Sequence, residues 1–372
     1  MTLLLKRSHK PATHAIVIGI GRYDWLVNGK KPTFAQNDGM AQLTSPPESA
    51  RAFASWLLDI YDNPDAPLAT LDLLISDSTG RFKVGAKDIA VQAATFANVA
   101  EAIRAWGKRG ARKDDLLVFF FSGHGISAGD QTTLLCEDYG SDDISPLRHA
   151  IDFRKLRIAM DRFAARRQCF FVDACRVATS NILETFDYYG QPVIDPLSAH
   201  SPQPRQAPVF HSALAGQQAY GRKRRPSYFT EALLRAFDGA ATDDARDGRW
   251  WVQTSVLLKA LQPVLQRVVK EPQQVATAED LSDFPLHRLK ERPRNIPVDV
   301  WCEPRERTAT AVLSYSGTKT KKTRTTRSPE AWELDLTEGR YTFKAKLTAP
   351  AAIRALDDEQ IRPPNRTIRI PV

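Results

Sequence analysis

The chain has 372 residues, with 42% hydrophobic and 26% charged side chains and a formal net charge of +9. This length allows one large domain and a small one, and the composition excludes a chain that is disordered throughout. No apolar run approaches the roughly 20 residues of a membrane-spanning helix, so we expect no contact with a membrane. The four cysteines lack metal-ligand spacing, so we expect no bound metal and reduced thiols in a cytoplasmic protein.

Apolar, β-branched runs alternate with amphipathic segments up to about residue 270. We expect strands at 14–20, 68–76, 115–121, 132–137, 168–175 and 208–216, and helices at 47–60, 95–110, 152–167, 228–237 and 254–269. This alternation predicts an α/β fold in which helices flank a mostly parallel sheet. Ligands bind at the carboxyl ends of the strands in such sheets, so the candidate site residues should lie there.

The remaining segments have a different composition. Residues 176–207 are rich in Pro, Ser and Gln and predict a long functional or disordered loop within a domain spanning 1–270. Residues 271–295 predict a linker, and 296–372 alternate like the strands of a small all-β, sandwich-like domain. The basic run 318–327 is expected to be a solvated hairpin loop that could dock an acidic partner.

Two chemically active side chains follow buried strands of the predicted sheet. His124 comes after "LLVFFFSG", and Cys175 comes after "CFFVDA". A parallel sheet brings both strand ends together, and a thiol beside a base is the usual arrangement of an activated cysteine nucleophile. Asp173 lies on the same face of its strand as Cys175. A negative neighbour would raise the pKa of the thiol, so Asp173 is expected to face a substrate.

These motifs resemble those of the caspase and metacaspase family of cysteine peptidases. The motif "FFFSGHG" is followed by "FFVDAC", with the cysteine 51 residues after the histidine, and "HAIVIGIGRY", "ARAFASWL", "VFHSALAGQQAYG" and "YFTEALLRAF" extend the resemblance over roughly 12–270. The resemblance implies the caspase fold and hydrolase activity. It also implies that His124 is the general base, that Cys175 is the nucleophile, and that the N–H groups of Gly125 and Cys175 form an oxyanion hole.

The resemblance further implies a preference for basic substrates. Metacaspases have Asp where this chain has Asp173, and there it recognises Arg or Lys before the scissile bond. They have a second acidic residue at the start of the first helix, where this chain reads "PPESAR". Ser49 occupies that position, and the neighbouring Glu48 is the candidate replacement. Arg205 in the long loop is the candidate site of self-processing.

The sequence therefore predicts a cysteine endopeptidase that cleaves protein substrates after Arg or Lys. By analogy it would be a regulated effector in bacterial stress or antiviral signalling, with an activating protein that contacts the C-terminal domain. The alternatives are a catalytically silent caspase-like scaffold and, less favoured, a nucleic-acid-binding protein that uses the basic C-terminal domain. No cofactor is expected, although the acidic run 136–143 with Asp152 leaves calcium as an option.

Overall fold

The computed structural model describes residues 2–128, 131–175, 189–196, 204–213, 221–244, 248–269, 276–280, 282–318, 320–348 and 350–372. The chain divides into two compact units. The first consists of Met1–Ala232 and Val268–Phe284, and the second of Leu233–Arg267 and Pro285–Val372. No helix in the described part of the chain is long and apolar enough to cross a membrane.

A seven-stranded sheet forms the centre of the first unit, in the order β1-β3-β2-β6-β10-β11-β14. The five inner strands are parallel, and the two edge strands are antiparallel to their neighbours. The strands are β1 (Thr2–Lys6), β2 (Thr13–Ile20), β3 (Leu68–Ser76), β6 (Leu116–Gly123), β10 (Arg167–Ala174), β11 (Val209–His211) and β14 (Thr277–Glu279). The predicted mostly parallel sheet is confirmed.

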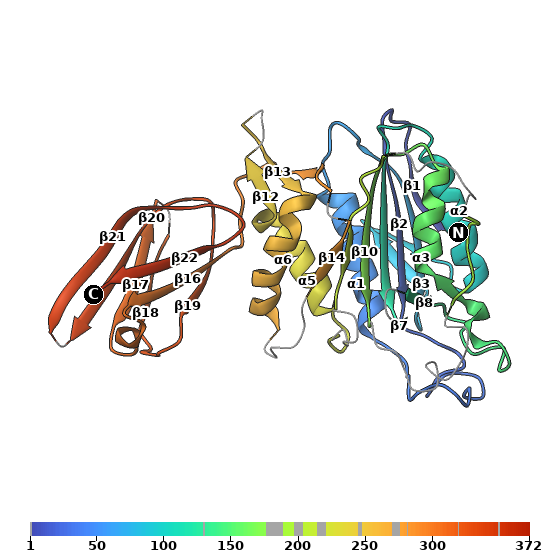
Figure 1. The fold of residues 1–372 in the computed structure, drawn as a ribbon, viewed down its shortest axis with the longest axis horizontal. Helices are drawn as coiled ribbons and strands as arrows, with labels where there is room; N and C mark the ends of the chain where they lie inside the picture. Colours follow the sequence, from blue (N-terminus) through green and yellow to red (C-terminus); the bar gives the residue numbers. More distant parts are fainter. Residues whose placement is uncertain are drawn as a thin grey trace. The chain divides into compact units, whose positions relative to one another are not determined.

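Helices cover both faces of this sheet (Figure 1). Phe120 of β6 stacks on Phe53 of helix α1 with ring centroids 4.5 Å apart, and the preceding Phe119 lies 6.0 Å from Trp106 of helix α2. Successive strand residues point to opposite faces, so α1 and α2 cover opposite sides. The helices in the described part of this unit are α1 (Ser45–Asp59), α2 (Phe96–Arg109), α3 (Phe153–Ala159) and the start of α5 (Tyr228–Arg235).

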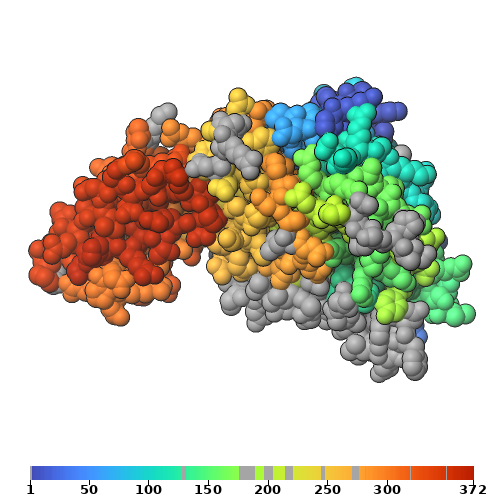
Figure 2. Space-filling model, turned by 45° about the horizontal axis from the view of Figure 1, so that its top comes forward, coloured from blue at the N-terminus to red at the C-terminus, as the bar shows by residue number. Residues whose placement is uncertain are grey.

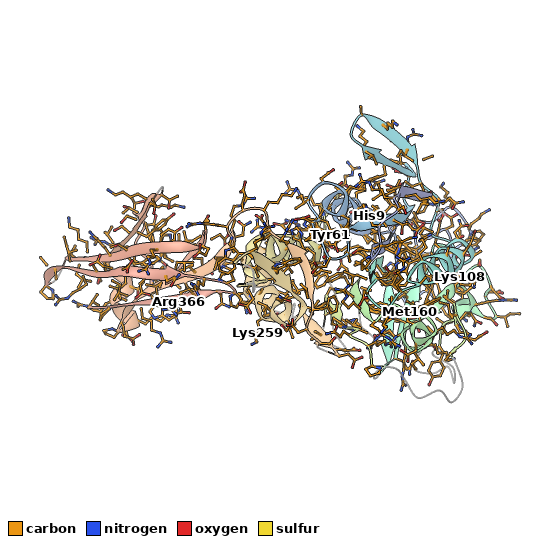
Figure 3. All side chains as sticks on the ribbon, turned by 90° about the horizontal axis from the view of Figure 1, so that it is seen from above. His9, Tyr61, Lys108, Met160, Lys259 and Arg366 are labelled. Atoms are coloured by element: carbon orange, nitrogen blue, oxygen red, sulfur yellow. The ribbon has the colours of Figure 1, made fainter. Side chains whose placement is uncertain are left out.

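Some elements differ from their sequence predictions. The expected strand 132–137 is β8 (Gln131–Leu135), which pairs with β7 (Gly125–Ala128) and β9 (Ala150–Asp152) in a small sheet of its own. The expected helix 152–167 stops at Ala159 and continues only as a 3₁₀ turn to Arg162. A hairpin of β4 (Arg81–Val84) and β5 (Lys87–Ala90) stands out from the unit in Figure 3.

The C-terminal part of the chain is a β-sandwich, as predicted. One sheet has the order β19-β16-β22 and the other β18-β17-β20-β21, and their inward side chains form one apolar core. The sandwich is drawn in orange to red in Figure 2. Its strands are β16 (Ile296–Glu303), β17 (Val312–Gly317), β18 (Lys321–Arg324), β19 (Trp332–Leu336), β20 (Gly339–Thr348), β21 (Ala351–Ile361) and β22 (Arg366–Pro371). Part of the expected basic loop is therefore strand β18.

The predicted linker 271–295 contains two strands instead. β14 extends the main sheet, whereas β15 (Pro285–Arg288) pairs with β13 (Trp250–Gln253), next to β12 (Thr242–Asp244). The second unit includes all of 233–267, with β12, β13 and nearly all of helix α6 (Thr254–Val268). The division into units thus differs from the boundary predicted at 270, because short strands pair with partners far along the chain.

Candidate active site

The candidate site is built where β6 and β10 end together. The two strands pair in parallel, with Ser122 opposite Asp173 and Gly123 opposite Ala174. The next residues include His124 and Cys175, which line one cavity of about 90 Å³. The strand-end argument thus places these two side chains correctly. The lining residues are Leu43, Ser45, Pro46, Ser122, Gly123, His124, Asp173, Ala174, Cys175, Gly221 and Ser227.

The imidazole of His124 is held in a defined orientation. Its Nε2 lies 2.8 Å from the carbonyl oxygen of Ala41. A carbonyl can only accept a hydrogen bond, so Nε2 carries the proton and Nδ1 of the neutral ring carries the lone pair. Nδ1 is therefore the atom that can take a proton from a thiol. A backbone carbonyl here does the orienting work that a carboxylate does in other catalytic triads.

Tyr23 and Gln42 support this orientation, and the sequence analysis did not identify either of them. The N–H of His124 donates to the hydroxyl of Tyr23 (2.7 Å), and the two rings lie 4.8 Å apart. The amide of Gln42 accepts from the N–H of Tyr23 (2.8 Å) and donates to its carbonyl (2.9 Å). The segment from Tyr23 to Gln42 thus fixes both the ring and the main chain of His124.

Burial sets the protonation of this histidine. It lowers the pKa of His124 below its ordinary value of 6.5, and the hydrogen bond to the Ala41 carbonyl opposes that shift. Because the pKa is lowered, the neutral ring persists as the pH falls through 6.5 and is protonated only in more acidic solution. The candidate base is therefore in its proton-accepting form at neutral pH.

This shift predicts the pH dependence of Cys175 reactivity. We expect the rate of Cys175 alkylation by iodoacetamide, an uncharged probe, to fall as the solution is made acidic. The midpoint of this fall should lie below pH 6.5. Mass spectrometry of Cys175 across a pH series measures the rate. In the His124→Ala variant this fall in rate at low pH should disappear, because the thiol has lost its base. A midpoint above 6.5 in the native protein would contradict the assignment of His124 as a buried neutral base.

Cys175 differs from the other three cysteines in its exposure. It is partly exposed, whereas Cys136, Cys169 and Cys302 are buried. Burial raises the pKa of each of those three thiols. A thiol with a raised pKa and no access to solvent is a poor nucleophile, so Cys175 is the reactive candidate.

Gly125 allows the nucleophile's backbone to approach closely. A Cβ atom at this position would lie 2.8 Å from the carbonyl oxygen of Cys175 and 2.9 Å from the Cβ atom of Ala174. Gly125, the first residue of β7, is therefore required by the close packing of two backbones. This contact places Gly125 next to Cys175, and the oxyanion-hole role of their N–H groups stays a prediction.

Substitution of Gly125 by alanine should separate these two backbones. We expect the Gly125→Ala variant to lose about a hundredfold in kcat/KM, because a misplacement of about 1 Å at a reacting group costs that much. Peptide hydrolysis and thermal unfolding, measured side by side, check this. Ser127→Ala on the same strand is the control and should keep its activity. A fully active Gly125→Ala variant would contradict the need for the close approach.

Asp173 contributes a buried carboxylate to the cavity. Its Oδ2 accepts hydrogen bonds from the hydroxyls of Ser122 (3.0 Å), Thr230 (3.0 Å) and Ser227. Ser227 precedes helix α5, and its hydroxyl also accepts from the N–H of Thr230. Burial raises the pKa of Asp173 above 3.8, and the hydroxyl donors oppose that shift. The sequence analysis identified the carboxylate but none of these donors.

Glu48 does not line this cavity, so it does not join Asp173 in the pocket expected for the basic side chain. Its carboxylate is 40% exposed and pairs with Arg51 at 3.0 Å. The neighbouring Ser49 is fully buried and accepts a hydrogen bond from the N–H of Ser227 (2.9 Å). Asp173 is therefore the only carboxylate among the described residues that line the catalytic cavity.

Arg205 is held in the structure, contrary to the expected locally unfolded processing segment. Its guanidinium binds the carboxylate of Asp161 (3.0 Å) and the carbonyl of Arg157 (2.7 Å). The following Gln206 exchanges backbone hydrogen bonds with Arg166 and Gln168. Cleavage after Arg205 would first have to break these contacts, so it stays a prediction. Residues 176–188 and 197–203 of the same loop lie outside the described residues.

The acidic run 136–143 has separate structural roles. Glu137 binds Arg22 and the hydroxyl of Ser76, and Asp138 accepts from the N–H of Phe96 at the start of α2. Asp152 likewise caps α3. Within the described ranges, no three His, Cys, Asp or Glu side chains are placed to hold a metal ion.

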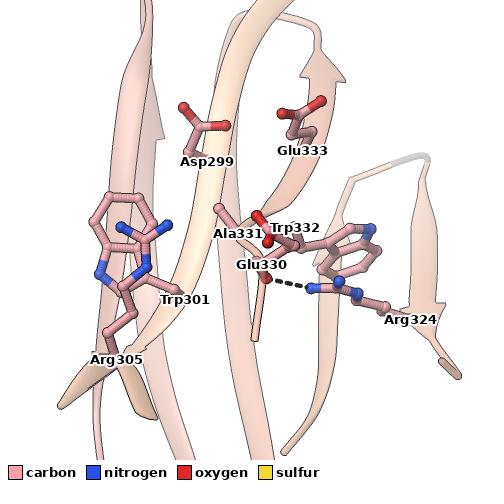
Figure 4. A pocket seen from close by; sticks show the side chains of 8 residues that line it. All are labelled: Asp299, Trp301, Arg305, Arg324, Glu330, Ala331, Trp332 and Glu333. Carbon is pink, nitrogen blue, oxygen red and sulfur yellow. Dashed lines mark hydrogen bonds between the residues drawn. The ribbon is translucent and has the colours of Figure 1, made fainter. Parts of the chain in front are cut away.

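A second hollow lies on the β-sandwich, with a volume of about 590 Å³ (Figure 4). The guanidinium of Arg305 lies over the ring of Trp301 at 5.2 Å. Asp299 and Glu333 face each other across β16 and β19, and Arg267 binds both carboxylates. The described lining of this hollow carries both positive and negative side chains and includes neither a thiol nor an imidazole. It consists of Asp299, Trp301, Arg305, Arg324, Glu330, Ala331, Trp332 and Glu333.

Comparison with known proteins agrees with the fold. The model of the caspase domain matches residues 12–281, and the chain therefore belongs to the caspase-domain family of cysteine peptidases. This confirms the resemblance seen in the sequence.

Individual relatives are distant. The uncharacterized protein y4kE of Sinorhizobium fredii (strain NBRC 101917 / NGR234) is 25% identical over 249 residues, which cover 63% of this chain and 70% of that protein. Among solved structures, protein GSU0716 of Geobacter sulfurreducens gives a TM-score of 0.46 at 15% identity, covering 75% of this chain and 100% of that one. Caspase-1 of Spodoptera frugiperda gives 0.41 at 12% identity, covering 73% and 88%.

Proposed function

We propose that this chain is an active cysteine endopeptidase that cleaves protein substrates after Arg or Lys. The observation that supports it is the shared cavity of Cys175, His124 and Asp173. A nucleophile, an oriented base and one buried negative charge meet there. A basic side chain is the substrate group that a buried carboxylate favours, since a guanidinium or ammonium supplies both charge and hydrogen bonds.

The proposed reaction follows from the geometry around His124. Nδ1 takes the proton of the Cys175 thiol, and the sulfur forms a bond to the substrate's carbonyl carbon. The N–H groups of Gly125 and Cys175 stabilise the oxygen that becomes negative. His124 then gives its proton to the leaving amine as the C–N bond breaks, which leaves a thioester. Water, activated by the same imidazole, hydrolyses the thioester and restores the thiol.

Hydrolysis of a peptide set tests this proposal. The peptides differ only in the residue before the scissile bond, which is Arg, Lys, Gln or Asp. We expect cleavage of the Arg and Lys peptides and none after Asp, because a second carboxylate beside Asp173 would be repelled. Equal cleavage after Asp and Arg would overturn the proposed specificity, and a preparation that cleaves none of the four would overturn the activity.

The cellular setting belongs to the same proposal. Four reduced thiols, three of them buried, support a cytoplasmic protein. The role as an effector in bacterial stress or antiviral signalling, and the activating partner at the C-terminal domain, rest on analogy and stay predictions.

A further inference from the structure

A groove continues from the catalytic cavity along the start of helix α1. Leu43 lines both hollows, and residues 44–48 alternate between them: Ser45 and Pro46 line the cavity, whereas Thr44, Pro47 and Glu48 line the groove. The groove has a volume of about 640 Å³, far larger than the cavity. A peptide with one side chain in the cavity extends by about 3.3 Å per residue, so its neighbouring residues reach the groove.

The acidic side chains of this groove form ion pairs within the protein. Arg51 binds both Glu48 (3.0 Å) and Asp77 (2.6 Å). Arg22, which also lines the groove, is matched by Glu137 (2.8 Å). These ion pairs hold the wall of the groove together, and both carboxylates of its lining, Glu48 and Asp77, are engaged by the shared Arg51.

Two other cations of the lining, Lys30 and Arg224, remain. Both side chains are exposed, and neither forms an ion pair with another described residue. Hydrogen bonds hold the main chain at or next to each of these two residues. Lys30 follows Gly29, whose N–H bonds to the carbonyl of Leu26 at 2.8 Å, and the N–H of Arg224 bonds to the hydroxyl of Thr44 at 3.1 Å. Lys30 and Arg224 therefore present two positive charges to the groove, from main-chain segments held by hydrogen bonds.

We propose that this groove binds an acidic side chain of the substrate. The preferred cleavage sequence would then combine Arg or Lys before the scissile bond with Asp or Glu a few residues away. The inference rests on the proposed peptidase function and adds a second charge requirement to it. Asp173 selects the basic residue, and Lys30 with Arg224 selects the acidic one.

A set of paired peptides tests the inference. Every peptide has Arg before the scissile bond. The two members of a pair differ only in carrying Glu or Gln at one position, which is one of the three residues before that Arg or the three after it. With the native full chain at low salt, we expect at least one pair to favour Glu by about fivefold in kcat/KM, and the preference to shrink in about 0.5 M salt.

Variants locate the effect. Lys30→Met and Arg224→Met should each reduce the Glu preference, and the double variant should remove it, while the Gln peptide is cleaved as before. Lys83→Met, an exposed lysine of the β4–β5 hairpin, is the control and should keep the preference. No Glu preference at any of the six positions, or a double variant that retains it, would overturn the inference.

A binding measurement distinguishes failure of the proposed peptidase function from failure of the groove inference. If the native chain hydrolyses none of the peptides, binding of the same fluorescently labelled pairs, measured by polarisation, decides the question for the groove. A Glu preference of about fivefold that disappears in the double variant would support the groove without peptidase activity. Equal binding of the Glu and Gln peptides would overturn it.

Discussion

Replacing Cys175 by alanine is expected to abolish hydrolysis of an Arg peptide, with a loss of at least about a thousandfold. His124→Ala should cost a similar amount, because the thiol then has no base to take its proton. The double variant should be no worse than either single variant, since the two groups act as one unit. Both residues line an existing cavity at strand ends, so neither change should open a large void in the core.

Hydrolysis of the Arg peptide and the thermal unfolding midpoint, measured on the same preparations, check this expectation. Cys302→Ala is the matched control, because that thiol is buried in the sandwich core, and this variant should keep its activity. Alkylation of Cys175 distinguishes an active peptidase from the catalytically silent scaffold. A native protein whose Cys175 reacts with iodoacetamide but which cleaves no peptide would be a caspase-like scaffold. Full activity in the Cys175→Ala variant would rule out the thioester mechanism.

The register of the two strands could be predicted once their ends were placed side by side. Cys175 lies 51 residues after His124, and the same offset separates Asp173 from Ser122, which are opposite each other in the parallel register. In a parallel pair, one offset relates all opposite residues, so placing His124 and Cys175 at adjacent strand ends also fixes the register of the residues before them. The sequence analysis used this offset for the histidine and cysteine only. Applied two residues earlier, it would also have identified Ser122 as a partner of the carboxylate.

The error on Glu48 could have been avoided from helical periodicity. In the helix expected at 47–60, Ala50, Phe53 and Leu57 recur at helical spacing and are buried, whereas Ile60 at the helix end is exposed. Ser49 lies four residues before Phe53 and shares this face, whereas Glu48 pairs with Arg51 at i+3 on the exposed side. A helix that buries Phe53 therefore turns Glu48 away from Asp173. The periodicity was a better guide than proximity in the sequence.

Other parts of the site have no sequence signal of this kind. Ser227 and Thr230 lie more than 50 residues after Asp173, and their hydroxyls reach it only because α5 begins beside the end of β10. Ala41 acts through its backbone carbonyl, which any residue could supply. The short strands β14 and β15 are three and four residues long, too short to show a period. Long-range packing decides these features.

Replacing Asp173 by asparagine is expected to lower kcat/KM for an Arg peptide by about 30- to 3,000-fold, the range for losing one partner of a buried charge pair at about 2–5 kcal/mol. The substitution keeps the shape of the side chain and removes its charge. Thr230→Val is the matched control, since it removes one of the hydroxyl donors and leaves the carboxylate in place, and its loss should be much smaller.

Two further measurements distinguish substrate recognition from a structural role. Asp173 is bonded to residues of β6 and of α5, so the unfolding midpoint of each variant must be compared with that of the native chain. The rate of Cys175 alkylation by uncharged iodoacetamide should be unchanged in Asp173→Asn, because that reaction uses no basic group. An Asp173→Asn variant that cleaves the Arg peptide like the native chain would refute charge recognition. One that loses alkylation and peptide cleavage to the same degree would show that the carboxylate acts by holding the site together.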